Sequence, residues 1–205
     1  MKLEFILIVF MFFTSWARAQ DNHQGMGQKA LMDGDFRLAV VHLEKAVFAD
    51  SNNISVLYML GYSLYHASNY KRAVGVFSKL VSLNSSNSSA YYYRGKARSA
   101  MAKEVGKLSN GDRERLFLLA VNDFSKAIGI DPGDIKLYQG RALVYYDYGV
   151  FKAQKNQKSY DRNKAINAFQ FCVADFHKMQ EISPGRKDIM SHLQEAAECL
   201  KELNP

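Results

Sequence analysis

The chain has little of the residues that interrupt or crosslink a polypeptide. Among its 205 residues there are three prolines, two cysteines and one tryptophan. Because proline breaks the interior of a helix, its scarcity leaves room for long uninterrupted helices. The sequence is 48% hydrophobic and 23% charged, so it can build a packed core, and this composition excludes a disordered chain. The length fits one domain, or at most two small ones.

Motifs that carry catalysis are also missing. The five histidines show no His-Glu-x-x-His or similar spacing of metal ligands. The sequence contains no Gly-x-Ser-x-Gly nucleophile elbow. The glycine-containing stretch "GKLSNG" at 106–111 lacks the Gly-Lys-Ser/Thr ending of a phosphate-binding loop. We therefore predict that the protein is not an enzyme, that it uses no metal or cofactor, and that nucleic acid is not its partner.

The two cysteines leave two interpretations open. In an oxidising compartment Cys172 and Cys199 could form a disulfide. Sequence alone cannot place their Cα atoms within bridging range. Cys172 falls at a position that other parts of the chain fill with alanine, which favours two packed thiols.

The first twenty residues, "MKLEFILIVFMFFTSWARAQ", have the pattern of a secretory signal peptide. Lys2 precedes an apolar run over 5–13, and Ala17-Arg18-Ala19 is a small-x-small cleavage site. The apolar run is too short to span a bilayer. We expect a signal peptide over 1–19, with an uncleaved anchor as the alternative. The Ala-x-Ala ending favours a bacterial signal, so the predicted location is the periplasm or outside the cell, with no transmembrane span in the mature chain.

An internal repeat runs through the rest of the sequence. The stretch "VNDFSKAIGIDPG" at 121–133 returns as "VADFHKMQEISPG" at 173–185. A small residue four places before a large apolar one marks four units, and the pairs are Ala39–Leu43, Ala73–Phe77, Ala120–Phe124 and Cys172–Phe176. The apolar anchors lie 34, 47 and 52 residues apart. The first interval is the tetratricopeptide period.

The chain closely resembles the tetratricopeptide-repeat family over residues 20–186. The family's motif positions are held in the second unit by Leu57, Leu60, Gly61, Leu64, Ala73, Phe77 and Leu80, in the third by Tyr91, Gly95, Ala120, Phe124, Ala127 and Pro132, in the fourth by Tyr138, Ala142, Tyr145, Cys172, Phe176 and Pro184, and more weakly in the first by Gly27, Ala30, Ala39, Leu43 and Ala46. The resemblance implies an all-α, right-handed α-solenoid of about four helical hairpins.

This resemblance sets the expected domain organisation. We predict one domain over 20–205, with repeats at about 20–53, 54–87, 88–134 and 135–186. In the tail, apolar residues step by four and three from Ile189 to Leu203, opposite a polar side. That pattern predicts an amphipathic capping helix over 187–203, because a stack of repeats needs a terminal helix with a polar outer face.

Repeats three and four are longer than the family period by 13 and 18 residues, and both excesses lie between the two helices of the hairpin. In repeat three we expect each helix of the hairpin to gain about two turns, whereas in repeat four the place of the turn stays open. Residues 98–119 and 147–171 carry net charges of +2 and +3. They predict a protruding basic lip, formed by Lys103, Lys107, Arg113, Arg115, Lys152, Lys155, Lys158 and Arg162. The favoured interpretation of these charges is an ordinary solvated helix face. The functional interpretation is a docking surface for an acidic partner or an anionic envelope polymer.

In the resembled family, the first helix of each unit lines a concave groove. The matching positions are Tyr58, Tyr62, Tyr65, Tyr92, Lys96, Gln139 and Tyr146. Tyrosine combines a large contact area with a polar tip and so suits a peptide-binding surface, although these rings could equally pack on a neighbouring hairpin. Family members that clamp a C-terminal carboxylate use Lys and Asn in the groove. Here those positions hold Gln24, Gln28, Met59, Ser89 and Tyr93, so no such clamp forms.

Three functions follow from these patterns. The first is a non-catalytic, exported scaffold that binds a protein segment in the tyrosine-lined groove. The second places binding on the basic lip. The third is a self-associating structural subunit of an envelope complex, so a homo-oligomer stays open.

Overall fold

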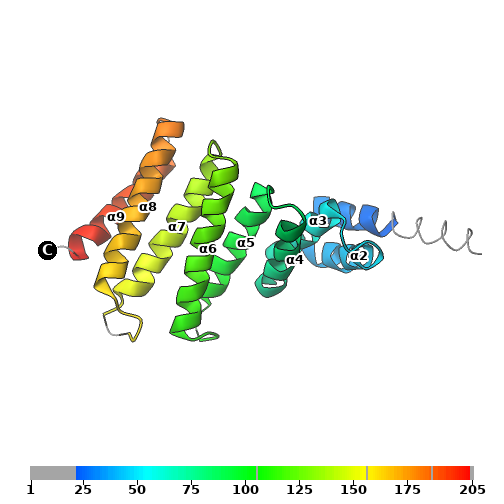
Figure 1. Ribbon diagram of the computed structural model, residues 1–205, viewed down its shortest axis with the longest axis horizontal. Helices are drawn as coiled ribbons and strands as arrows, with labels where there is room; N and C mark the ends of the chain where they lie inside the picture. The colour runs from blue at the N-terminus through cyan, green and yellow to red at the C-terminus, as the bar shows by residue number, and fades with distance from the viewer. Residues whose placement is uncertain (1–21, 105, 156, 186, 204–205) are drawn as a thin grey trace, which may run out of the picture. The chain divides into compact units, whose positions relative to one another are not determined.

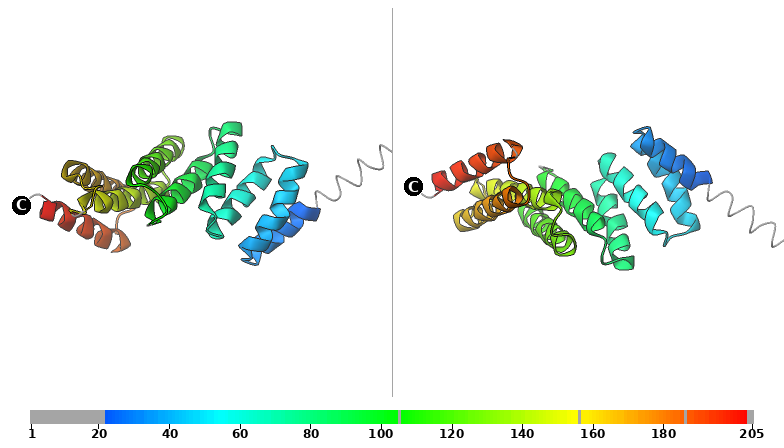
Figure 2. Two further views of the ribbon diagram at one scale, coloured as in Figure 1. Left: turned by 90° about the horizontal axis from the view of Figure 1, so that it is seen from below. Right: turned by 90° about the horizontal axis from the view of Figure 1, so that it is seen from above.

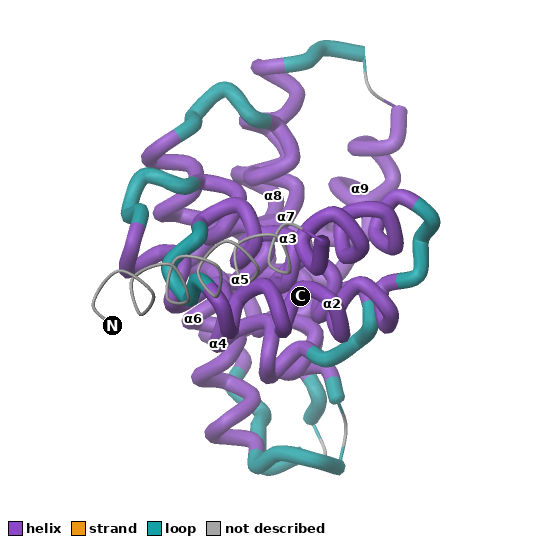
Figure 3. The backbone as a smooth tube through the Cα atoms, turned by 90° about the vertical axis from the view of Figure 1, so that its right-hand side faces the viewer, coloured by secondary structure: helices purple, strands orange, loops and turns teal. Residues whose placement is uncertain are grey.

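The computed structural model describes residues 22–104, 106–155, 157–185 and 187–203. The predicted signal peptide at 1–19 lies outside these residues. Every regular element in the described part is a helix, which confirms the all-α prediction (Figures 1 and 3). The elements are a helix over 22–32, α2 (Phe36–Ala49), α3 (Ile54–His66), α4 (Tyr70–Leu83), α5 (Ser88–Lys103), α6 (Asn110–Ile130), α7 (Ile135–Ala153), α8 (Arg162–Ile182) and α9 (Lys187–Leu203).

The helices form two compact units that meet in the sequence at Ser85 and Ser86. The first unit holds the helix over 22–32, α2, α3 and α4. The second holds α5 to α9, and each of its helices packs against the next one along the chain (Figure 2). The sequence predicted a single domain over 20–205, whereas the packing groups the hairpins two and two, with α9 in the second unit.

Polar side chains fix where most of the helices begin. At α3, Asn53 accepts a hydrogen bond from the backbone N–H of Val56 through its side-chain oxygen, over 3.1 Å. Asn87 does the same for Ala90 at the start of α5, over 2.9 Å. Such caps satisfy backbone donors that the first turn of a helix leaves unpaired. Further caps of this kind are Asp35, Ser109, Asp134 and Asp161.

Small residues on the first helix of each hairpin face large apolar side chains on the second. A Cβ atom added at Gly61 would lie 2.8 Å from the ring of Phe77, which is fully buried. At Gly95 it would lie 3.0 Å from the ring of Phe124. The glycines therefore let the two helices approach each other until the rings fill the space between them.

The extra length of the third and fourth hairpins continues the same packing. Seven residues beyond Gly95 and seven before Phe124 lie Ala102 and Phe117, both buried in one cluster. In the fourth hairpin the corresponding added pair is Gly149 and Phe169, and a Cβ at Gly149 would lie 2.9 Å from that ring. Seven residues are about two helical turns, so the pair returns to the same face of each helix.

Helix lengths show where the sequence expectation succeeds. Both α6 and α8 have 21 residues, against 14 in α4, and α7 has 19 against 13 in α3. The gain of about two turns expected in the third hairpin is right for α6, and the fourth hairpin's α7 and α8 are lengthened to a similar degree. It is wrong for α5, which has 16 residues, because the chain leaves the helix at the C-cap Glu104.

Two buried carboxylates explain the Asp-Phe step that both echoing stretches share. Asp123 is fully buried, and its carboxylate accepts hydrogen bonds from Arg94 Nη2 at 2.7 Å and from Arg98 Nη1 at 2.6 Å. Asp175 accepts a hydrogen bond from Arg141 Nη2 at 2.7 Å. Burial of a carboxylate is costly unless it is paired and hydrogen-bonded. Each aspartate therefore ties the second helix of its hairpin to an arginine on the first.

Helix α9 covers the last hairpin. Its Ala196 and Leu203 are buried against α8, and the ring of His192 stacks on Phe176 with centroids 5.9 Å apart. Arg162, at the start of α8, donates two hydrogen bonds to the carbonyl oxygen of Leu203, over 2.8 and 2.6 Å. These contacts give α9 the position that the amphipathic pattern predicted.

Candidate protein-binding surface

Aromatic rings gather on one face of α3, in the first unit. The rings of Tyr58 and Tyr62 have centroids 6.4 Å apart, and those of Tyr62 and His66 are 4.3 Å apart. Tyr65 meets His66 edge-on at 5.2 Å. From the preceding hairpin, Phe36 at the start of α2 stacks on His66 at 4.7 Å and lies 6.2 Å from Tyr62. We call these five residues the aromatic cluster.

A surface pocket of about 450 Å³ lies beside this cluster. Phe36 and His66, stacked on each other, line it together with Arg37. The full lining consists of Gly34, Asp35, Phe36, Arg37, His66, Ala67 and Ser68, from the turns that close the first and second hairpins. Sequence reasoning missed Phe36 and Arg37, because they stand just after a turn, outside the repeat motif. Only packing brings them next to α3.

The structure places the three predicted tyrosines at the cluster, where they also pack on core residues. Tyr58 meets Phe77 edge-on with centroids 6.2 Å apart, and Tyr65 lies 5.6 Å from Tyr70. All three side chains are half-buried. Because each ring is held by its neighbours, the cluster is ordered before any partner arrives, which lowers the entropic cost of binding.

The predicted groove residues of the second unit come from α5 and α7. Tyr92 meets Phe124 edge-on at 5.7 Å, and Lys96 Nζ lies 5.4 Å from the centre of the Tyr92 ring. Tyr146 meets Phe169 edge-on at 5.7 Å, and burial raises the pKa of its hydroxyl. Gln139 is half-buried on α7. The rings of Tyr92 and Tyr146 therefore lean on the core phenylalanines of their own hairpins.

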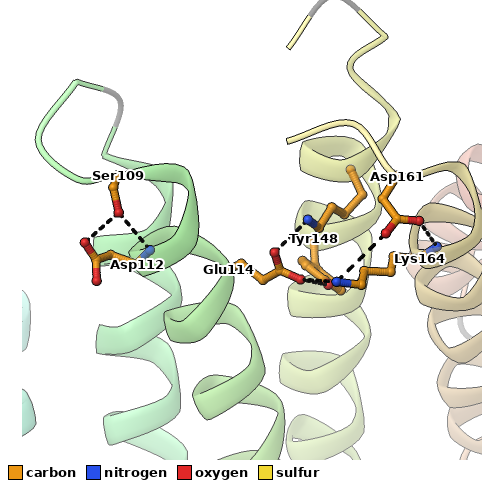
Figure 4. Close-up of polar contacts among 7 residues, drawn as sticks. Ser109, Asp112, Glu114, Tyr148, Asp161 and Lys164 are labelled. Atoms are coloured by element: carbon orange, nitrogen blue, oxygen red, sulfur yellow. Dashed lines mark hydrogen bonds and ion pairs between the residues drawn. The ribbon is translucent and has the colours of Figure 1, made fainter. Parts of the chain in front are cut away.

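One carboxylate joins three helices in the lengthened part of the second unit (Figure 4). Glu114 of α6 accepts hydrogen bonds from the Tyr148 hydroxyl at 2.8 Å and from Lys152 Nζ at 2.7 Å, both on α7. Lys164 Nζ of α8 donates to it at 2.9 Å. Partial burial raises the pKa of the Glu114 carboxyl, but the three donors outweigh burial and hold that pKa at about 2. Burial and the neighbouring carboxylate both raise the pKa of the Tyr148 hydroxyl.

Comparison with known proteins locates the fold. No family model matches the chain, and no curated protein sequence matches it either. A solved structure described as "YrrB: a TPR protein with an unusual peptide-binding site" covers 87% of this chain and 76% of its own, at 19% identity and a TM-score of 0.62. A crystal structure of MamA protein covers 91% of both chains, at 20% identity and a TM-score of 0.57. The first TPR of Spaghetti (RPAP3), bound to an HSP90 peptide, covers 74% of this chain and 96% of its own, at 16% identity and a TM-score of 0.54. The chain has a tetratricopeptide-repeat fold.

The connections between the helices of repeats three and four lie at the same edge of the second unit, where the basic lip was predicted (Figure 1). Including Lys152 in that lip was wrong. Its side chain is 7% exposed, and it pairs with Glu114 at 2.7 Å. A lysine so deeply buried must keep a partner, and it presents no charge to solvent.

Other predicted lip residues are engaged by contacts within the second unit. Arg113 Nε donates to the carbonyl oxygen of Ala102 at 2.7 Å, and its guanidinium lies 4.6 Å from the centre of the Phe151 ring. Arg162 donates to the C-terminal end of α9, as described above. Lys103 pairs with Asp147 at 3.0 Å, and Lys107 with Glu104 at 3.1 Å, both on the surface.

Arg115, Lys155 and Lys158 are exposed members of the predicted lip. A count of positive charges along the sequence does not reveal which of them pair. In repeats three and four, many of the positive side chains pair within the protein and hold its helices together. The lip therefore presents less positive charge to solvent than a count of its lysines and arginines suggests.

Both cysteines in this repeat fold are free thiols. Cys172 is buried in the core of the fourth repeat, and burial raises the pKa of its thiol to about 12. Cys199 on α9 is half-buried, and burial raises its pKa too. In the described part of the chain, no three or more His, Cys, Asp or Glu side chains group as a metal site. Of the helices described, none has the length and apolar character that crossing a membrane requires.

Proposed function

We propose that this protein is a non-catalytic scaffold that binds a segment of another protein at the aromatic cluster. The observation that carries the proposal is the pocket of about 450 Å³ beside the stacked rings of Phe36 and His66. A pocket of this size takes a bulky side chain or a short run of residues. Exposed aromatic side chains near such a pocket are the residues that most often anchor a partner.

The chemistry of the pocket lining defines the kind of segment expected. The stacked rings offer an apolar wall, and Tyr62 supports it from behind. Arg37 lines the same pocket and is exposed, so it can pair with a carboxylate of the partner. We therefore expect a segment that carries a bulky apolar residue close to an acidic one.

Similar folds support peptide binding as a class of function. YrrB is described as having an unusual peptide-binding site, and the RPAP3 repeat was solved with an HSP90 peptide. The positions that would clamp a terminal carboxylate in this chain hold Gln, Met, Ser and Tyr instead of Lys and Asn. We infer that the segment is internal to its protein or is held without a terminal clamp.

Export completes the proposal. The pattern of residues 1–20 supports a cleaved signal and a periplasmic or secreted protein. Expression with a reporter fused after Pro205, followed by cell fractionation and N-terminal sequencing, tests it. A mature chain beginning at Gln20 outside the cytoplasm is expected. An uncleaved cytoplasmic chain would contradict export.

Crosslinked pull-down from a cell envelope tests the binding surface. The chain is compared with a Tyr58→Ala, Tyr62→Ala, Tyr65→Ala variant and with Arg37→Glu, which changes the pocket at an exposed position without touching the core. Far-UV circular dichroism checks that both variants fold. We expect both to lose the partner that the unchanged chain captures. If both variants retain it, the partner binds elsewhere.

A lip variant, Arg115→Ser, Lys155→Ser, Lys158→Ser, is the matched control. Binding to the aromatic cluster should survive it and should weaken only modestly between low and physiological ionic strength, because salt screens the single pair with Arg37 and not the apolar contacts. Loss of binding in this variant, together with steep weakening by salt, would place the partner on the lip instead.

Self-association is a second candidate function, and one feature favours it. Helix α2 carries Leu38, Val41 and Phe48 on its surface, with exposed fractions of 46%, 50% and 86%. Spacings of three and seven residues put them along one side of the helix. Light scattering tests this directly, with Phe48→Ser as the variant. A concentration-dependent oligomer that dissociates in Phe48→Ser is expected, and a monomer at high concentration would remove this candidate.

A further inference from the structure

Two histidines meet in the first hairpin, away from the aromatic cluster. His23 lies on the helix over 22–32 and His42 on α2, and their Nδ1 atoms are 3.3 Å apart. The ring centroids are 5.5 Å apart, with 32° between the ring planes. The helices are close here because Gly27 has no side chain, and a Cβ in its place would lie 2.6 Å from Leu43. The pair is thus a product of the hairpin packing, not of sequence proximity.

The two nitrogens can be related in two ways. In a hydrogen bond, one Nδ1 carries the proton and the other accepts it. Alternatively, both nitrogens are unprotonated and share a cation. Two imidazole nitrogens bound at about 2.0–2.1 Å to one tetrahedral ion lie about 3.3–3.4 Å apart. The observed 3.3 Å matches this value, and it lies at the long end of hydrogen-bond distances, for which about 2.7–3.2 Å is usual between an N–H donor and an oxygen.

We propose that His23 and His42 form a two-imidazole binding site for a divalent zinc ion. Imidazole nitrogen is a preferred ligand of zinc, and the separation of the two nitrogens fits tetrahedral coordination. Two ligands fill half of that shell, so water completes the other two positions. Both side chains are only partly buried, so an ion reaches them from solvent. This site is independent of the proposed peptide binding.

Zinc at this site links the two helices of the first repeat. An ion that binds only the folded hairpin stabilises it in proportion to its concentration relative to the dissociation constant. Because two side chains hold the ion, we expect binding weaker than at a four-ligand structural site. The physical effect is a clip between the helix over 22–32 and α2, at the end of the described chain.

Isothermal titration of the purified chain with zinc chloride, without a polyhistidine tag, tests the proposal. We expect one zinc per chain and a saturable rise in Tm. His23→Gln and His42→Gln should each weaken binding at least tenfold while leaving the zinc-free Tm nearly unchanged. His177→Gln is the matched control, since His177 is exposed on α8 and contacts Gln180 instead. It should bind zinc as the unchanged chain does.

Nitrogen NMR observes the two ring nitrogens directly, so it distinguishes zinc coordination from a change in stability alone. Zinc should leave Nδ1 unprotonated in both rings, with the proton of each neutral imidazole on Nε2, and should shift both Nδ1 signals together, in the unchanged chain and in His177→Gln. If the titration shows no heat, or if His23→Gln and His42→Gln bind as tightly as the unchanged chain, the pair is a hydrogen bond only and the proposal fails.

Discussion

Single residues in this protein are placed by the need to pair buried charge. Asp123 and Asp175 lie in the cores of the third and fourth repeats and receive arginines from the facing helices. At the equivalent place in the second repeat the chain has Val76, which is apolar and needs no partner. An arginine and an aspartate each prefer water to an apolar core, so such a pair holds only when its geometry is good.

Glu114 gives a prediction with a defined pH range. Its pKa in the folded chain is about 2, below the ordinary 4.5, because three donors stabilise the charged form. A lowered pKa contributes stability that is present above the ordinary pKa and is lost as pH falls towards the folded one. Glu114→Gln should therefore lower the free energy of unfolding by about 1–3 kcal/mol at neutral pH. The difference from the unchanged chain should shrink between pH 4.5 and about 2.

Urea unfolding, followed by circular dichroism over this pH range, measures the difference. Glu104→Gln is a suitable control, because Glu104 pairs with Lys107 at the surface. Its effect should be small at every pH. A Glu114→Gln effect that stays constant down to pH 2 would show that the carboxylate charge is not what the three donors recognise.

The two thiols should differ in reactivity. Only the thiolate reacts with alkylating reagents, and burial both hides Cys172 and raises its pKa to about 12. Iodoacetamide at neutral pH should label Cys199 slowly and leave Cys172 untouched in the folded chain, as read by peptide mass spectrometry. Equal labelling of both would contradict the burial of Cys172. Labelling of neither until a reductant is added would reveal a disulfide instead.

At the scale of elements, the lengthened hairpins repeat one packing rule. A small residue on the first helix faces an aromatic ring on the second, and seven residues further on the pattern recurs with Ala102 and Phe117 or with Gly149 and Phe169. The added turns are therefore core, not decoration on the surface. Seven residues are about two helical turns, so the added side chains lie on the same face of the helix and pack in the same way as the earlier ones.

Phe169 is the residue that tests this rule. It is 1% exposed and lies against Gly149, so Phe169→Ala leaves a cavity and should cost about 3–5 kcal/mol of unfolding free energy. Phe171, two residues away, is 55% exposed and should cost less than about 1 kcal/mol when changed to alanine. Chemical denaturation of the two variants measures both values. Similar losses would mean that the extension contributes no core.

The extensions also show how far sequence reasoning reached. The places of the repeats follow from spacing, because apolar residues at periods of three and four mark a helix face wherever it lies, although α5 ends earlier than expected. Which charged side chains form ion pairs could not be predicted from the sequence. Lys103 and Asp147, for example, are 44 residues apart in the chain yet pair in space. The aromatic cluster was half predicted. Its tyrosines stand at repeat positions, whereas Phe36 joins them from another hairpin.

At the scale of the molecule, the repeats divide into two compact units at Ser85 and Ser86. A repeat protein is held mainly by contacts between neighbours, so part of it can fold without the rest. The second unit contains the long hairpins, the Glu114 contacts and the α9 cover, which together give it the larger core.

We expect a fragment over 86–205 to remain helical and to unfold cooperatively. Limited proteolysis should cut first near the exposed Ser85 and Ser86 and release this fragment. Circular dichroism and thermal unfolding of the purified fragment measure the outcome. A fragment that is unfolded in isolation would show that the second unit depends on the first for its stability.

The sequence by itself determined the helices, their order, the repeat and the capping helix, because these depend on local periodicity and on small residues at fixed positions. Tertiary structure decided which charges are neutralised, which rings meet and where His23 finds His42. Those outcomes depend on distances between side chains far apart in the chain, and such distances are set only when whole hairpins pack against each other. Lys152 is an example: the sequence placed it on a basic surface, whereas the packing of α7 against α6 buries it beside Glu114.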